Sequence, residues 1–149
     1  SNKLKIDSAG GQVELRFNHP VKELLWHTND TAAQGDTDNV GSCLLQLNGH
    51  DRFRKRAGSY FRTVQRYEHH AGAASTNAVG TRGLHMYSFA LKPEEHQPSG
   101  TCNFSRIDNA VLSVEAATGA TLNTNFKVYA VNYNVLRIMS GMGGLAYSN

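Results

Sequence analysis

Histidine is the residue type in this chain that most readily does chemistry, because its imidazole binds metals and exchanges protons near neutral pH. The chain has 7 histidines, but none of them forms the H-x-H pair of a cupin-type metal site. His69 and His70 are adjacent, so their side chains diverge. Glu94, Glu95 and His96 follow one another between prolines, with no further ligand cluster nearby in the sequence. The sequence therefore predicts no metal and no cofactor.

Nucleophilic catalysis is not indicated either. The chain has no G-x-S-x-G motif, and its 2 cysteines have no recognisable catalytic signature and no C-x-x-C spacing. We expect Cys43 and Cys102 to be small, buried residues with free thiols at strand starts. Gly141–Gly144 reads GMGG, but only 5 residues follow it, too few for the helix that a phosphate-binding loop requires. We expect a flexible turn there, no catalytic residue and no enzymatic activity.

Basic residues are concentrated in one segment, although the net charge is only +3. This segment, Arg52–Arg66, also contains aromatic residues that could stack on nucleic-acid bases. The same aromatics recur at helical spacing, which favours their packing in the core with the arginines facing solvent or a neighbouring subunit. Arginine suits such contacts because its guanidinium pairs bidentately with carboxylates. The residues expected to make inter-subunit contacts are Arg54, Arg56, Arg62 and Arg66, and nucleic-acid binding stays open as an alternative.

Two N-x-S/T sequons are possible glycosylation sites. Asn29 lies in a polar segment that should be an accessible loop, whereas Asn103 flanks an expected strand. Both are predicted positions for a glycan.

The elements that would position these residues are mostly strands. Apolar and polar residues alternate in short runs, which is typical of half-buried strands. A kinked strand or strand pair is expected around Pro20, which cannot donate a ladder hydrogen bond. Asn48-Gly49 suits a turn after a short strand. The expected strands are Val13–Phe17, Val21–Thr28, Leu45–Leu47, Leu84–Leu91, Ala110–Ala116 and Phe126–Ile138.

One segment has a different period. Apolar residues in Phe53–Tyr67 recur every three or four positions, which predicts an amphipathic helix weakened by Gly58. Its expected core-facing residues are Phe53, Ala57, Tyr60, Phe61, Val64 and Tyr67. In the last strand, Tyr129, Val131, Tyr133 and Val135 are expected to lie together against a neighbouring strand or sheet.

These elements predict an all-β fold in one domain. Several strands with long connections and one short helix in a loop favour an antiparallel β-sandwich, and a jelly roll is the version that tolerates long insertions. No apolar run approaches the roughly 20 residues that a membrane-spanning helix needs. A carbohydrate-binding sandwich would require clustered carboxylates or exposed aromatics, which the sequence does not indicate.

Three phrases of the sequence resemble one protein family. They are FNHPVKELLW at Phe17–Trp26, SFALKPEEHQPSGTCNFSRIDN at Ser88–Asn109, and VYAVNYNVLRIMSGMGGLAYSN at Val128–Asn149. Together they closely resemble the C-terminal end of the double jelly-roll major capsid proteins of nucleocytoplasmic large DNA viruses, such as phycodnaviruses and iridoviruses. This resemblance implies a structural function in an icosahedral shell.

The resemblance also implies an assembly. In that family each subunit has two jelly rolls, three subunits form a capsomer, and capsomers contact one another and minor capsid proteins. The implied location is the virion, assembled in the host cytoplasm, with a shell that can overlie an internal membrane. No specific nucleic acid is implied as a partner, and glycosylation occurs in the family. Residues 1–149 would be the C-terminal part of the second jelly roll, without its first strands. A carbohydrate-binding or nucleic-acid-binding β-sandwich is the alternative function.

Overall fold

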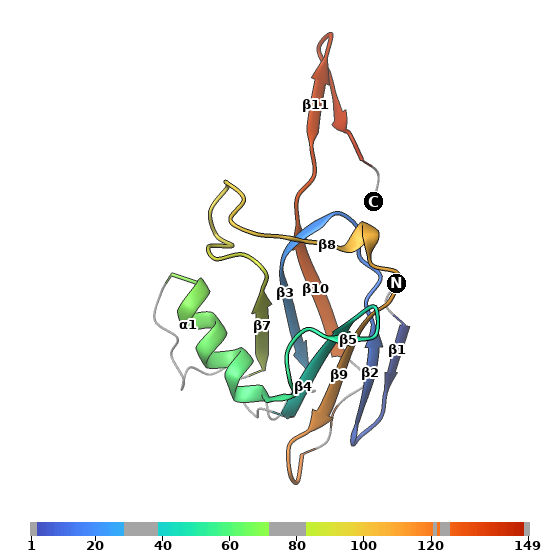
Figure 1. The fold of residues 1–149 in the computed structure, drawn as a ribbon, viewed down its shortest axis with the longest axis vertical. Helices are drawn as coiled ribbons and strands as arrows, with labels where there is room; N and C mark the ends of the chain where they lie inside the picture. The colour runs from blue at the N-terminus through green and yellow to red at the C-terminus, as the bar shows by residue number, and fades with distance from the viewer. Residues whose placement is uncertain (1–2, 29–38, 72–82, 121, 123–125, 148–149) are drawn as a thin grey trace.

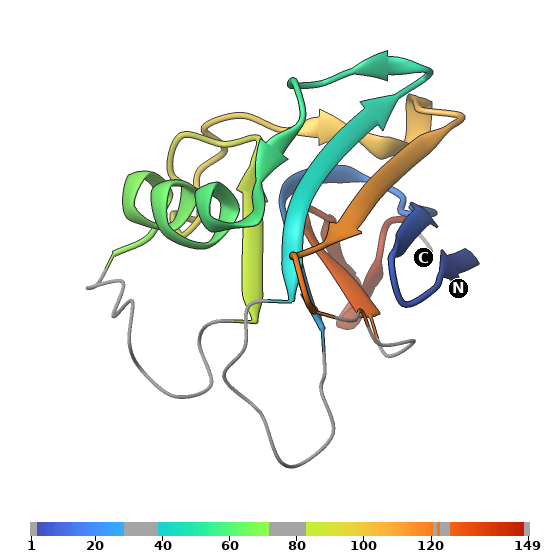
Figure 2. The same cartoon turned by 90° about the horizontal axis from the view of Figure 1, so that it is seen from below.

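Two antiparallel sheets lie face to face, with a short helical segment at one side (Figures 1 and 2). The computed structural model describes residues 3–28, 39–71, 83–120, 122 and 126–147. The two sheets and the single short α-helix in this part of the chain confirm the expected antiparallel β-sandwich with one short helix.

The first sheet has the strand order β1-β2-β9-β4-β5, and β6 also pairs with β4. Strands β4 and β5 are joined by the expected turn, in which Asn48 and Gly49 have φ angles of 51° and 79°. The bounds are β1 Lys3–Ile6, β2 Gly10–Glu14, β4 Val40–Leu47, β5 His50–Asp51, β6 Arg56–Ala57 and β9 Ala110–Ala116.

The second sheet has the order β10-β3-β7, and β8 pairs with the start of β3. Strand β2 ends at Glu14 and β3 begins at Pro20, and the two strands belong to different sheets, so neither the expected kinked strand nor the expected strand pair is observed. His19 makes this crossing in the left-handed region, with φ 70°. The bounds are β3 Pro20–Thr28, β7 Leu84–Ser88, β8 Cys102–Asn103 and β10 Phe126–Asn132, and a short 3-10 helix, η2, follows at Phe104–Arg106.

The core fills the space between the sheets. On β9 the alternate residues Ala110, Leu112 and Val114 are buried, as the period-2 pattern predicts. From the second sheet, Trp26 and Leu24 are fully buried against them. Each buried apolar side chain of this size contributes roughly 1.5–3 kcal/mol, so this layer accounts for much of the stability.

The helical segment is shorter than its sequence pattern predicts. Residues 53–57 are not helical, and the last two of them form β6. A π-helical turn, η1 (Tyr60–Val64), leads directly into α1 (Gln65–His69). A π-turn contains more residues per hydrogen-bonded turn than an α-turn does. Residues after Val64 therefore do not lie on the face of the helix that an α-helical spacing of three or four predicts.

Three of the six residues that the helical spacing predicts to face the core do so. Phe61 is fully buried, and Phe53 and Tyr60 pack against the core. In contrast, Tyr67 is 81% exposed, and Val64 and Ala57 are also exposed. Gln65 is buried in their place, where its amide bonds the Tyr60 hydroxyl and the Ser88 backbone N–H.

The predicted last strand is two elements. β10 ends at Asn132, and residues 136–145 form a separate hairpin of β11 (Leu136–Met139) and β12 (Met142–Leu145). The face assignment is reversed, because the inward side of β10 carries Phe126, Val128 and Ala130. Tyr129 and Val135 are about half exposed, at 50% and 55%.

Candidate interaction surfaces

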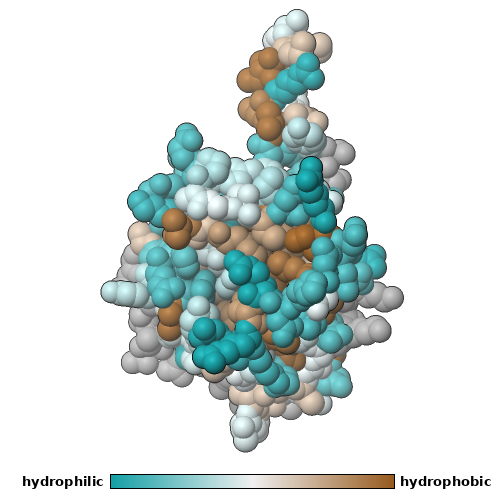
Figure 3. All heavy atoms as spheres, viewed as in Figure 1, coloured by the Kyte–Doolittle hydropathy of each residue, from teal (hydrophilic) through white to brown (hydrophobic). Residues whose placement is uncertain are grey.

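The β11–β12 hairpin extends away from the sandwich and carries a run of exposed apolar side chains (Figures 1 and 3). We call these residues the hairpin surface. Each is 54% to 75% exposed, and Ser140 and Gly141 form the turn at the tip with positive φ. The GMGG segment is therefore part of a hairpin turn, as expected, followed by strand β12. The hairpin surface consists of Val135, Leu136, Ile138, Met139, Met142, Leu145 and Tyr147.

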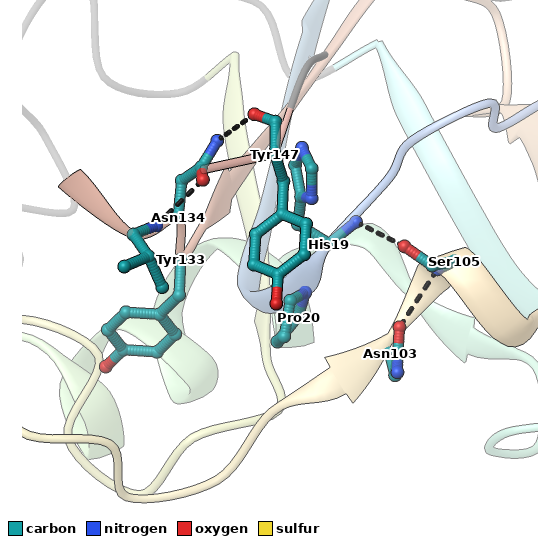
Figure 4. A pocket seen from close by; sticks show the side chains of 8 residues that line it. His19, Pro20, Asn103, Ser105, Tyr133, Asn134 and Tyr147 are labelled. Carbon is teal, nitrogen blue, oxygen red and sulfur yellow. Dashed lines mark hydrogen bonds between the residues drawn. The ribbon is translucent and has the colours of Figure 1, made fainter. Parts of the chain in front are cut away.

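A cavity of about 320 Å³ lies where this hairpin leaves the sandwich (Figure 4). We call it the root pocket. Its walls come from three separate stretches of chain, which are the same stretches that carry the resemblance described above. The lining residues are His19, Pro20, Asn103, Ser105, Tyr133, Asn134, Val135 and Tyr147.

Hydrogen bonds fix the polar part of the root pocket. The His19 backbone N–H donates to Ser105 Oγ at 2.9 Å, and the Ser105 N–H donates to Asn103 Oδ1 at 3.1 Å. On the hairpin side, Asn134 Nδ2 donates to the Tyr147 carbonyl oxygen at 2.9 Å. These bonds use backbone and short polar groups, so the aromatic and proline faces supply most of the remaining wall. Sequence reasoning did not find this pocket, because its walls are up to 128 positions apart, from His19 to Tyr147.

The four predicted contact arginines do not share one helix face. Arg54 is exposed in the segment between β5 and β6, and Arg56 lies on β6. Arg62 lies on η1 and Arg66 on α1, both partly buried. The guanidinium carbon of Arg56 is 4.4 Å from the centre of the Tyr60 ring, a cation–π distance.

The interleaved aromatics are mostly core residues. The ring of Phe53 is 5.2 Å from that of Phe61 and 4.8 Å from that of Tyr87. Such centroid distances are typical of packed aromatic pairs. Only Tyr67 presents its ring to solvent, so the segment does not form a row of aromatic platforms for bases.

His70 links three elements that are far apart in sequence. Its Nδ1 lies 2.8 Å from Glu94 Oε1, and its Nε2 lies 2.8 Å from Oε2 of the buried Glu23. The His70 ring thus bridges the carboxyl groups of Glu23 on β3 and Glu94 in the connection after β7. The Ala71 backbone N–H, and then His70, hold the pKa of Glu94 below its usual value of 4.5. The adjacent His69 points elsewhere, to the Leu91 carbonyl.

Replacing His70 with alanine should therefore destabilise the fold by about 2 kcal/mol, because it leaves the buried Glu23 carboxyl without its hydrogen-bond partner on the imidazole. Chemical denaturation at neutral pH measures this loss. His50→Ala, an exposed histidine in the β4–β5 turn region, is the matched control and should change stability by less than about 0.5 kcal/mol. Equal effects of the two substitutions would contradict this role of His70.

The remaining candidate residues are placed as follows. Cys43 is buried in the middle of β4 rather than at its start, and Cys102 begins β8; neither forms a disulfide. Burial raises the pKa of the Cys102 thiol. Asn103 is exposed, and its side chain caps η2. Asn29 lies outside the described residues. Within the described ranges, no three His, Cys, Asp or Glu residues gather as a metal site, and no helix could cross a membrane.

The fold agrees with comparisons to known proteins. The family model of the large eukaryotic DNA virus major capsid protein matches residues 3–144. The chain belongs to this family, which is one of structural capsid proteins.

Individual relatives show how much of such a protein the chain represents. It is 50% identical over 163 residues to the major capsid protein of Pyramimonas orientalis virus, covering 96% of this chain and 40% of the relative. For the major capsid protein of Paramecium bursaria Chlorella virus 1 the identity is 41% over 197 residues, covering 95% of this chain and 44% of the relative. The chain thus spans less than half the length of these relatives.

Comparison with solved structures also matches this chain to about half of a capsid protein chain. A chain of the PBCV-1 virus capsid, from a quasi-atomic model, matches with a TM-score of 0.76 and 38% identity over 100% of this chain and 49% of that chain. The Faustovirus major capsid protein, at 12% identity and a TM-score of 0.59 over 89% of this chain, shares the fold.

Proposed function

We propose that this chain acts as part of a major capsid protein subunit, in which three copies of the subunit form a capsomer and capsomers build the icosahedral shell of a large DNA virus. The observation that carries the proposal is the family match over residues 3–144. The proposed location is the virion after assembly in the host cytoplasm, with neighbouring capsomers and minor capsid proteins as partners. The role is structural, and the proposal assigns no reaction to the chain.

Within such a subunit, we assign residues 1–149 to the C-terminal part of the second of two jelly rolls. Two observations support this assignment. The chain matches about half (49%) of the PBCV-1 capsid chain, which is the share expected for about one of two jelly rolls. In addition, β10 pairs only with β3, so among the described residues its other edge has no strand beside it. An open edge next to a packed core is where further strands of a sandwich would pair.

Two kinds of surface residue have proposed roles in this assembly. Arg54, Arg56, Arg62 and Arg66 are proposed contacts to acidic groups of a neighbouring subunit, and exposed Arg54 is the best placed of them. Asn29 and Asn103 are proposed glycan positions. Asn103 is exposed and lines the root pocket, and its side-chain Oδ1 accepts a hydrogen bond from the Ser105 N–H.

The proposal predicts that this chain is an abundant component of purified virus particles. Trypsin should release Val128–Arg137, which follows Lys127 and ends at an arginine, as a strong peptide from the particles. Native mass spectrometry of capsomers released at mild pH should give three times the subunit mass. Absence of the peptide from the particles would contradict the proposal, as would salt-sensitive DNA binding as the chain's main interaction.

A further inference from the structure

His70 is held between two carboxyl groups that belong to different parts of the fold. Its Nε2 lies 2.8 Å from Oε2 of Glu23 on β3, and its Nδ1 lies 2.8 Å from Oε1 of Glu94. Glu94 belongs to the connection between β7 and β8, residues 89–101, and its Oε2 accepts the Ala71 backbone N–H at 3.0 Å. All of these groups are in the described part of the chain, so the cluster is complete without any contribution from another chain or domain.

The two contacts of the His70 ring require two protons. A ring nitrogen and a carboxyl oxygen at this distance attract each other only when one of them carries a proton that points to the other. Each contact therefore needs its own proton, whether that proton sits on the imidazole or on the carboxyl group. A neutral imidazole between two ionised carboxylates holds only one proton. Loss of the second proton thus leaves one nitrogen and one oxygen facing each other with lone pairs alone, and that contact becomes repulsive.

Burial decides which of the two contacts breaks. The side chain of Glu23 is 8% exposed, whereas that of Glu94 is 45% exposed. A buried carboxylate that loses its hydrogen-bond partner bears the full free-energy cost of its desolvation, whereas an exposed carboxylate can bond water instead. The hydrogen bond that a ring nitrogen makes also fixes which nitrogen keeps the proton. The remaining ring proton therefore stays on Nε2, which faces Glu23, and Nδ1 releases Glu94.

The elements packed around His70 carry other titratable groups, and their contacts lie elsewhere. On the strands beside β3, the residues paired with Glu23 are Ser88 of β7 and Val131 of β10, and neither carries a charge. The proton count of the cluster is therefore set mainly by its own three groups. Among the described residues, the charged or titratable side chains of β3, of α1 and of the connection that bond none of these three groups are Lys22, Arg66, Glu68, His69, Lys92, Glu95 and His96.

We propose that Glu23, His70 and Glu94 form a proton-operated latch, which fastens the connection between β7 and β8 to the end of α1. With two protons in the cluster the latch is closed. When rising pH removes one of them, Glu94 is released while His70 stays bound to Glu23. The local order of the connection thus depends on pH. The latch acts through contacts within one chain, so it does not rest on the proposed function.

On the acid side the latch stays closed over a wide range. The Ala71 backbone N–H, and then His70, hold the pKa of Glu94 below its usual value of 4.5. A carboxyl group whose pKa is lowered by folding adds stability above its unfolded pKa, and that stability is lost only as the pH falls through the folded pKa. At about pH 5.5 Glu94 is therefore still ionised and still accepts its hydrogen bonds. Opening is expected on the alkaline side.

Hydrogen exchange of the full-length subunit, measured by mass spectrometry and corrected for the intrinsic effect of pH, tests the latch. The amides to follow are those of Leu91, Lys92 and Glu95, which bond within the connection. Their protection should fall at least about tenfold from about pH 5.5 to about pH 9, as expected for the loss of one charge-assisted hydrogen bond. The amides of β3, the central strand of its sheet, are the reference and should keep their protection. Equal protection of the connection at both pH values would overturn the proposal.

Glu94→Gln distinguishes the latch from a simple ion pair. The introduced amide can donate its NH₂ to an unprotonated Nδ1 of His70, while its carbonyl oxygen still accepts the Ala71 N–H. The contact then needs only the one proton of a neutral imidazole, so the connection should stay protected at about pH 9 and the pH step should disappear. Glu95→Gln is the matched control in the same connection, because Glu95 pairs only with Lys92, and it should retain the step. A step that persists in Glu94→Gln, or protection that is lower at every pH, would show that the latch is wrong.

Discussion

Replacing Phe61 with alanine should lower the free energy of unfolding by roughly 3–5 kcal/mol. Phe61 is fully buried, and its ring centre is 5.3 Å from that of Trp26 and 5.2 Å from that of Phe53. It is the side chain by which the helical segment is anchored to the core between the sheets. The loss combines the burial free energy of the ring with the cavity that it leaves. Denaturant unfolding measures the total loss, and it can be followed by the fluorescence of Trp26, the only tryptophan.

Tyr67→Ala is the matched control for this result. Both residues are aromatic, both belong to the helical segment, and the spacing in the sequence places both on one apolar face. Because Tyr67 is 81% exposed, its replacement should cost less than about 0.5 kcal/mol. A cost for Tyr67→Ala that approaches that of Phe61→Ala would mean that the helix is rotated relative to the structure described above.

Replacing Gly58 with alanine should destabilise the protein by about 1–3 kcal/mol. Helix propensity alone predicts the opposite, a gain of roughly 1 kcal/mol from removing a glycine from a helix. In the structure, however, an added Cβ would overlap the Val40 carbonyl oxygen and would also lie 3.2 Å from Val40 Cγ1. The helix start packs directly on the backbone of β4, so either the helix or the strand must move.

The change in the midpoint of thermal unfolding measures this effect. Gly144→Ala is a suitable control, because a Cβ at Gly144 meets no atom within 4 Å and its backbone needs no positive φ. It should leave the stability unchanged within about 0.5 kcal/mol. A stabilising effect of Gly58→Ala would show that local helix propensity outweighs the close contact with β4.

The sequence by itself determined the class of fold and located six of the strands at least in part, namely β2, β3, β4, β7, β9 and β10. Strand β9 follows directly from its residues, since their alternation and β-branched content fit a pleated, half-buried surface. Strand β7 was expected at Leu84–Leu91 from its composition, but it ends at Ser88. The Asn48-Gly49 turn was equally predictable, because few residues other than glycine and asparagine adopt positive φ readily. The resemblance to capsid proteins was visible in three phrases of the chain and agrees with the family match.

Only the tertiary structure decided where the helix starts, which side chains of β10 face the core and where β10 ends. Phe126, Val128 and Ala130 point inward because Leu24 and Trp26 lie opposite them on β3, whereas the tyrosine side of the strand is larger and equally regular in its spacing. Periodicity reports that a strand has two faces, but it does not report which of them meets the core. The exposure of Tyr67 could not be predicted for a similar reason, because its orientation depends on a π-turn that the residue pattern does not indicate.

The interaction sites also depend on contacts across the fold. Glu23, His70 and Glu94 come together from β3, the end of α1 and the connection after β7, and their sequence neighbours gave no sign of this. The root pocket is assembled in the same way from three stretches of chain. Sequence spacing predicts contacts within one helix or strand, because the backbone geometry there is fixed. Contacts between elements depend on how the two sheets pack, and that is a property of the whole fold.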